Sequence, residues 1–215
     1  MAEIIPAILT NDPEQYKKTV TIFQPFTKRA QIDVSDGTFA PVATIPLNNV
    51  WWPKEWQIDL HMMVVRPSEQ LPIILQLKPS LCIFHAECSE DLLPVIEKIK
   101  AAGIKAGVAL MQATFPGSVK QYIEAADHVL IFAGEIGKQG GQADMLQTEK
   151  VPLIKAINPN CEIGWDGGAN LKNVRAIYRA GVDIINVGSA LTTASDPGAM
   201  YEALVADLDK RGVVL

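Results

Sequence analysis

Two aspartates lie in the stretch QIDVSDG, which begins at Gln31, among side chains that folded proteins usually bury. If this stretch is a β-strand, alternation places Gln31, Asp33 and Ser35 on one face, opposite the intervening apolar residues. If Ile32 and Val34 pack against a hydrophobic layer, the polar face is enclosed, and such a face usually belongs to a site. The alternative is an edge strand with its polar face in water, and the stretch alone leaves both interpretations open.

A further carboxylate, Asp166, ends another apolar stretch and is followed by two glycines. Two carboxylates on opposite sides of one bound molecule could remove a proton from one face of a carbon and return one to the other. Solvated loop carboxylates are the alternative interpretation. Glycines also follow two further apolar stretches, and backbone N–H groups in such loops can converge on a phosphate. The predicted phosphate-binding residues are Gly140, Gly141, Gly167, Gly168, Gly188 and Ser189.

The elements that must position these residues alternate along the chain. Short β-branched runs predict strands, and stretches of helical period lie between them. Asp12-Pro13 and Asp196-Pro197 indicate helix starts, and Ser89 is expected to cap a further helix. Residues 35–56 predict a long loop with at most a short helix. The eight predicted strands are residues 4–9, 30–34, 58–64, 81–86, 105–110, 128–133, 161–165 and 183–188.

This alternation predicts a parallel sheet, either open and doubly wound or closed as a (β/α)8 barrel. Eight units in 215 residues favour the closed barrel, as one domain over residues 1–215. The active site of such a barrel lies at the C-terminal ends of the strands. Polar residues collect at these predicted ends, namely Asp33, Asp36, His61, His85, Glu87 and Asp166. His128 begins a strand, so it is expected at the opposite end of the barrel.

Composition limits the classes of partner. The net charge of −5 and the absence of a Lys/Arg cluster argue against a nucleic acid or an anionic membrane surface, although a small anionic substrate remains compatible. Three cysteines without a CxxC pair predict neither a disulfide framework nor a zinc knuckle. There is no signal-peptide pattern and no apolar stretch long enough to cross a bilayer. We therefore expect a cytoplasmic protein.

The chain resembles the ribulose-phosphate 3-epimerase family over nearly its whole length, in the order and spacing of IIPAIL, QIDVSDGTFAP, DLHMMV, FHAE, GVAL, GGQ, WDGGAN and VGSA. The resemblance implies a (β/α)8 barrel, usually oligomeric, that interconverts D-ribulose 5-phosphate and D-xylulose 5-phosphate with a divalent metal, commonly zinc or iron. It implies that Asp33 and Asp166 are both acid/base residues and metal ligands, and that His61 is a further ligand. The six residues of the glycine loops match the family's phosphate-binding positions.

The departures from the family pattern concern the same site. Gln31 stands where the family has its first metal-binding histidine, and Ala7 stands where it has a serine near the substrate. Ser35 replaces a methionine, and IGKQGGQ replaces NPGFGGQ. An amide oxygen is a poor substitute for an imidazole nitrogen on zinc. The metal is therefore expected to be weakly held or absent.

Three functions are consistent with these residues. The leading hypothesis is a homo-oligomeric ketose-phosphate 3-epimerase in which Asp33 and Asp166 exchange protons at C3, with His85 and Glu87 as supporting residues. The second is a non-catalytic phosphosugar-binding protein, because Gln31 and Ala7 remove family side chains while the glycine loops stay intact. A decarboxylase or aldolase is the weakest, since DLHMMV lacks the lysine of the DxKxxD pattern.

Overall fold

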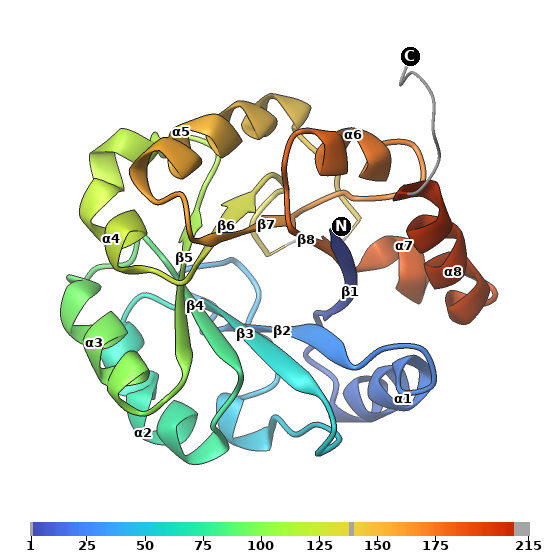
Figure 1. Ribbon diagram of the computed structural model, residues 1–215. Helices are drawn as coiled ribbons and strands as arrows, with labels where there is room; N and C mark the ends of the chain where they lie inside the picture. Colours follow the sequence, from blue (N-terminus) through green and yellow to red (C-terminus); the bar gives the residue numbers. More distant parts are fainter. Residues whose placement is uncertain (1, 138–139, 209–215) are drawn as a thin grey trace.

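The computed structural model of the protein describes residues 2–137 and 140–208. Within these residues, eight parallel strands close into a barrel in chain order, with helices around the outside (Figure 1). The prediction of a single-domain closed (β/α)8 barrel is confirmed, and the open sheet is excluded. The strands are β1 (Glu3–Ile8), β2 (Arg29–Ser35), β3 (Gln57–Met63), β4 (Leu81–His85), β5 (Lys105–Leu110), β6 (His128–Phe132), β7 (Glu162–Asp166) and β8 (Ile184–Val187).

Both Asp-Pro pairs begin helices as predicted, and Asp196 accepts the backbone N–H of Ala199 at the start of α8. Asp12 caps α1 by accepting hydrogen bonds from the backbone N–H groups of Glu14 and Gln15. The expected cap at Ser89 is wrong, because its hydroxyl donates to the carbonyl of Val65 in another loop. The helices are α1 (Pro13–Phe23), α2 (Pro67–Leu77), α3 (Leu93–Ala101), α4 (Lys120–Ala125), α5 (Lys150–Ile157), α6 (Val174–Arg179), α7 (Ser189–Thr192) and α8 (Pro197–Leu208), and the 3-10 helices are η1 (Leu47–Asn49), η2 (Pro116–Val119) and η3 (Met145–Glu149).

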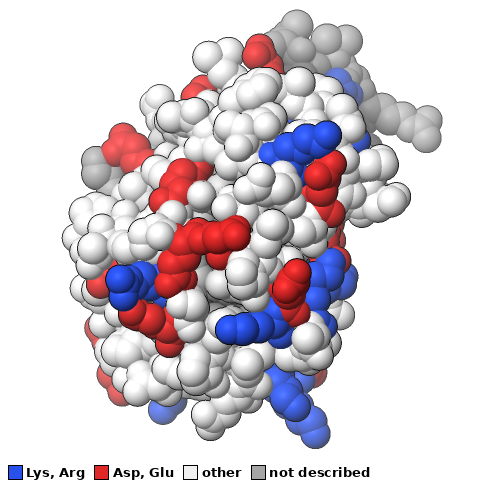
Figure 2. All heavy atoms as spheres, turned by 90° about the vertical axis from the view of Figure 1, so that its left-hand side faces the viewer, with Lys and Arg blue, Asp and Glu red and all other residues white. Residues whose placement is uncertain are grey.

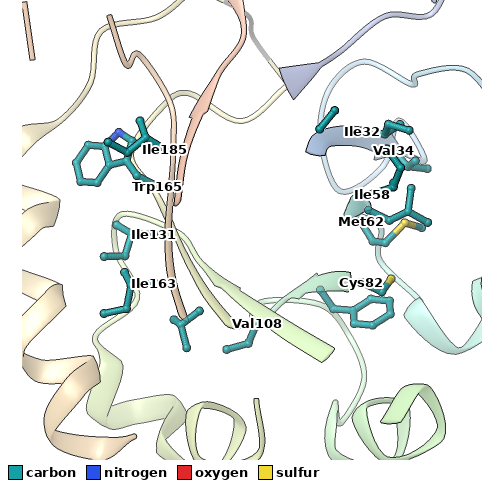
Figure 3. Packing of buried hydrophobic residues seen from close by; sticks show 14 of the residues in the cluster. Ile32, Val34, Ile58, Met62, Cys82, Val108, Ile131, Ile163, Trp165 and Ile185 are labelled. Carbon is teal, nitrogen blue, oxygen red and sulfur yellow. The ribbon is translucent and has the colours of Figure 1, made fainter. Parts of the chain in front are cut away.

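The two faces of each strand pack in different layers. Outward residues such as Ile32 and Val34 join the main hydrophobic cluster between the strands and the helices (Figure 3). A smaller apolar cluster of Leu81, Ile83, Ala109 and Leu130 has the opposite alternation and therefore fills the barrel interior. Because β2 pairs with both β1 and β3, the edge-strand alternative is wrong, and its polar face lies inside the barrel.

The second aspartate of QIDVSDG belongs to a loop. Asp36 is exposed, and its carboxylate accepts hydrogen bonds from the backbone N–H groups of Thr38 and Phe39 and, across the barrel rim, of Val65. These backbone hydrogen bonds lower the pKa of Asp36, although its partial burial acts to raise it. Asp36 therefore fixes the start of the long β2–β3 loop, which contains η1 and otherwise fits the prediction for residues 35–56.

Charges of both signs are mixed on one face of the molecule. On the face drawn in Figure 2, Lys and Arg side chains lie among Asp and Glu side chains and do not gather into one basic area among the described residues. No helix in the described part of the chain is long and apolar enough to cross a membrane.

An ionic cluster joins five strands, β1, β2, β3, β6 and β7, near their N-terminal ends and away from the predicted site. Arg29 pairs with Glu3 at 3.3 Å, with Asp59 at 2.8 Å and with Glu162 at 2.8 Å. His128 Nδ1 lies 2.9 Å from the same Glu162 carboxylate. Burial alone would raise the pKa of Glu162, but hydrogen bonds from His128 and Arg29 hold it well below its usual range.

Glu162→Gln is expected to lower the free energy of unfolding at neutral pH by about 1–3 kcal/mol, because charged hydrogen bonds are lost. A carboxylate with a lowered folded-state pKa stabilises the fold above its unfolded-state pKa, near 4.5, and loses this effect as the pH falls below that value. The difference between variant and wild type should therefore shrink in acid. Urea unfolding over a pH series measures it.

Glu69→Gln is the matched control, since Glu69 pairs with Arg66 at 3.0 Å on the surface. We expect a change below about 0.5 kcal/mol at every pH. An equal loss in both variants would show that the cluster at Glu162 has no special role in stability.

Candidate active site

Strand register brings the predicted chemical groups together. Asp33 on β2 lies beside His61 on β3, and Ala7 on β1 lies beside Gln31. Asp166 ends β7, on the other side of β1 and β8 from β2. All of these residues except Gln31 line one pocket at the C-terminal ends of the strands, where a barrel of this type places its chemistry.

The side-chain amide of Gln31 lies at the centre of this group. Its Nε2 donates to Asp33 Oδ1 at 2.8 Å and to Asp166 Oδ2 at 2.6 Å, and lies 3.5 Å from His61 Nδ1. Gln31 is fully buried, and its Oε1 has no hydrogen-bond partner. One amide nitrogen therefore links carboxylates from two separate strands.

His61 provides positive charge beside these carboxylates. Its Nδ1 lies 3.0 Å from Asp33 Oδ1 and 3.4 Å from Asp166 Oδ2. Burial acts to lower the pKa of His61, but the interactions with Asp166 and Asp33 raise it to about 9. Burial also raises the pKa of Asp33, and the hydrogen bond from His61 opposes this shift. The pocket thus contains a proton donor and carboxylate acceptors in direct contact.

Two further polar residues continue from His61 into the barrel wall. His61 Nε2 lies 2.8 Å from His85 Nε2, and His85 Nδ1 lies 3.3 Å from Glu87 Oε2. Burial lowers the pKa of His85 to about 4, while Glu87 acts in the opposite direction. Burial raises the pKa of Glu87, but hydrogen bonds from His85, Thr114 and the Met111 N–H leave it below its usual value. His85 and Glu87 therefore lie outside the pocket and are joined to it by the hydrogen bond to His61.

Asp33, His61 and Asp166 could hold a metal ion. One ligand atom from each lies within 4.8 Å of the other two. Two carboxylate oxygens and an imidazole nitrogen form a suitable donor set for a divalent transition metal. The nitrogen of the Gln31 amide, however, lies in the space between these atoms and presents hydrogen atoms to them. The three ligands fit a divalent ion, provided that this amide turns or moves.

The glycine loops form another wall of the same pocket, which includes all six predicted phosphate-binding residues. Gly167 and Gly168 have positive φ angles of 116° and 68°. A Cβ atom built on Gly168 would lie 2.2 Å from the backbone nitrogen of Ala143, so only glycine fits this approach of two loops. The pocket wall here is backbone and small side chains.

Sequence reasoning missed several pocket residues and misplaced one. Asn186 and Phe132 also line the pocket, and their alternation with the outward residues of β8 and β6 was the signal that could have found them. Asn186 is buried, with its Nδ2 bonded to the Trp165 carbonyl and its Oδ1 unpaired. Ser35 does not line this pocket, because β2 ends there and its hydroxyl accepts the N–H of Gly37.

The family model and the curated relatives that match this chain belong to the same family. The sequence model described as the ribulose-phosphate 3 epimerase family matches residues 3–192. The ribulose-phosphate 3-epimerase of Helicobacter pylori is 33% identical over 180 residues, which cover 80% of this chain and 83% of the relative. That of Schizosaccharomyces pombe is 29% identical over 211 residues, covering 94% of this chain and 92% of the relative.

Solved structures share the fold at lower identity. The crystal structure of a 3-hexulose-6-phosphate synthase matches with a TM-score of 0.72 over 96% of this chain and 99% of that chain, at 15% identity. At 15% identity, this similarity shows only that the two proteins share the barrel fold.

Proposed function

The chain belongs to the ribulose-phosphate 3-epimerase family, and from this membership we propose that it is a ketose-phosphate 3-epimerase. The substrate is ribulose 5-phosphate, with xylulose 5-phosphate as product, or a closely related sugar phosphate. Asp33 or Asp166 removes the C3 proton to give an enediolate, and the other aspartate returns a proton to the opposite face. A general acid or base of this kind contributes about 10²- to 10⁴-fold to the rate.

One observation carries the proposal: carboxylates from β2 and β7 open into one pocket and meet at one buried amide nitrogen. The strands that hold them are separated by β1 and β8, so the two carboxylates can approach a bound sugar from different sides. The ring of His61 lies beside both aspartates, and a positive charge on it favours negative charge on the nearby enediolate oxygens.

The glycine loops support the binding of a phosphate at the β7–β8 side of the pocket. Backbone N–H groups at Gly140, Gly168 and Ser189 are the proposed donors. The two glycines have positive φ angles, which favour glycine, and without side chains they leave room for the phosphate. The phosphate end of the substrate is thereby anchored away from Asp33. This leaves the C3 carbon between the two aspartates.

The metal site is proposed to be weaker than a four-ligand site of the family. Asp33, His61 and Asp166 would hold the ion, and when bound it supplies electrostatic stabilisation of negative charge on substrate oxygens. Gln31 offers an amide in place of an imidazole and fills the space between the ligand atoms with a donor group. Ala7, which lines the pocket, provides no hydroxyl in compensation.

Incubation with ketopentose and ketohexose phosphates in D₂O tests the proposed function. We expect solvent deuterium at C3 of both substrate and product, detected by NMR and mass spectrometry. Absence of C3 exchange with every ketose phosphate, under both metal-loaded and chelated conditions, would exclude an epimerase.

A non-catalytic phosphosugar-binding protein is the second candidate, because the Gln31 amide already satisfies both carboxylates. Calorimetric binding of a ketose phosphate without C3 exchange would favour it. Assembly as a homo-oligomer is part of the leading proposal, and sedimentation analysis measures it.

A further inference from the structure

A line of hydrogen bonds leads from the pocket into the barrel wall through His61, His85 and Glu87. The two imidazole rings are fully buried, and their Nε2 atoms lie 2.8 Å apart. His85 Nδ1 lies 3.3 Å from Glu87 Oε2. The proposed reaction uses only the pocket side of His61, which leaves the function of the other two residues open.

The direction of these hydrogen bonds follows from the far end of the line. Glu87 Oε1 accepts the backbone N–H of Met111 at 2.9 Å and the hydroxyl of Thr114. An ionised carboxylate can only accept, so the hydrogen between Glu87 and His85 belongs to Nδ1 of His85. The Nε2 atom of a neutral His85 then carries a lone pair. Only one hydrogen fits between the two Nε2 atoms, so it belongs to His61.

Charge supports the same assignment. Two carboxylates, Asp33 and Asp166, face His61 Nδ1 at 3.0 and 3.4 Å, whereas Glu87 alone faces His85. With Glu87 at the far end, the hydrogen bond between the two Nε2 atoms runs from His61 to His85, away from the pocket. The proton on His61 Nε2 is the same whether Nδ1 donates to Asp33 or binds a cation.

We propose that Glu87 is a positioning residue that, acting through His85, keeps a proton on Nε2 of His61 and so directs Nδ1 of His61 at Asp33 and Asp166. When one ring nitrogen of a histidine is held as a donor, the tautomer is fixed and the other ring nitrogen points in a fixed direction. Histidines that bind metals are oriented in the same way. Its importance for catalysis rests on the proposed function, whereas the tautomer itself does not.

Aromatic side chains pack against the two histidines of this line. The ring of Phe39 lies 4.7 Å from that of His85, and the ring of Phe132 lies 5.8 Å from His85 and 5.9 Å from His61, between centroids. These apolar rings pack against both histidines and limit the water that could replace their hydrogen bonds. The direction of the line is therefore set by Glu87.

Glu87→Gln tests the proposal with almost no change of shape. The amide oxygen should take the place of Oε1, because Met111 N–H and Thr114 hydroxyl both require an acceptor. The amide NH₂ then faces His85 Nδ1, which must become an acceptor. His85 would carry its hydrogen on Nε2, and His61 would lose the hydrogen on its own Nε2.

Two-bond ¹H–¹⁵N NMR spectra of the purified protein distinguish these tautomers. We expect protonated His61 Nε2 and His85 Nδ1 in the wild type, and protonated His85 Nε2 with unprotonated His61 Nε2 in Glu87→Gln. Zinc affinity and kcat should each fall by about 10–100-fold, with a smaller change in KM because the glycine loops are untouched. Glu97→Gln, at an exposed position of α3, is the matched control. It should leave the histidine tautomers, the zinc affinity and kcat unchanged.

An unprotonated His61 Nε2 in the wild type would overturn the proposal, and so would an unchanged His61 tautomer in a folded Glu87→Gln protein. If this variant does not fold, the wild-type spectrum alone gives the decision. Because the tautomers are measured without substrate, their result stands separately from failure of the epimerase assay.

Discussion

Asp33→Asn and Asp166→Asn should each lower epimerisation by about 10²- to 10⁴-fold, yet each should keep one half of the proton exchange. In a two-base mechanism, each aspartate removes the C3 proton of one epimer. The remaining base can still exchange the proton of its own epimer with solvent. One variant should therefore incorporate deuterium only into the ribulose isomer, and the other only into the xylulose isomer.

NMR of each isolated ketose phosphate after incubation in D₂O measures this pattern. Asp36→Asn is the matched control from the same stretch of chain. The carboxylate of Asp36 accepts hydrogen bonds from backbone N–H groups of loops outside the pocket. It should lower stability and retain epimerisation with exchange of both epimers. Loss of both exchanges in both pocket variants would contradict a division of roles between the two aspartates.

The fold was predictable because its signals are local and repeated. Alternation placed Gln31 and Asp33 on the inward face of β2, and parallel register then brought Asp33 beside His61 without further information. The glycine loops follow from the same logic, because the C-terminal ends of parallel strands meet at one rim. The closed barrel turned these separate ends into one pocket.

The parts that the sequence did not predict depend on which partner a polar group meets. Asp33 and Asp36 are three residues apart, and only the end of β2 at Ser35 assigns one to the pocket and the other to a loop. Ser89 has a good capping side chain, but a carbonyl from a distant loop takes its hydroxyl. The orientation of the Gln31 amide likewise depends on carboxylates from two strands. Such contacts are tertiary, and no local pattern encodes them.

The orientation of Gln31 leads to the second large expected effect, in which Gln31→His raises zinc affinity by at least about 100-fold. Even outer-shell partners change metal affinity by about 10–100-fold, and this substitution adds a direct ligand. It also removes an amide nitrogen that lies 2.6 Å from Asp166 and 2.8 Å from Asp33, in the space between the ligand atoms. Metal analysis of tag-free protein, purified without chelator, measures the number of metal ions per chain in the wild type and in Gln31→His.

Thermal unfolding gives an independent measure of the same difference. Because a tightly bound ion stabilises the folded state by mass action, chelation should lower the Tm of Gln31→His much more than that of the wild type. Gln121→His, at an exposed position on α4, adds a histidine outside the pocket and should behave as the wild type does. A stoichiometric metal that resists chelation in the unmodified protein would mean that the amide turns and presents its unpaired Oε1 to the ion. In that case Gln31 supports tight binding together with Asp33, His61 and Asp166, and the prediction of a weakened site is wrong.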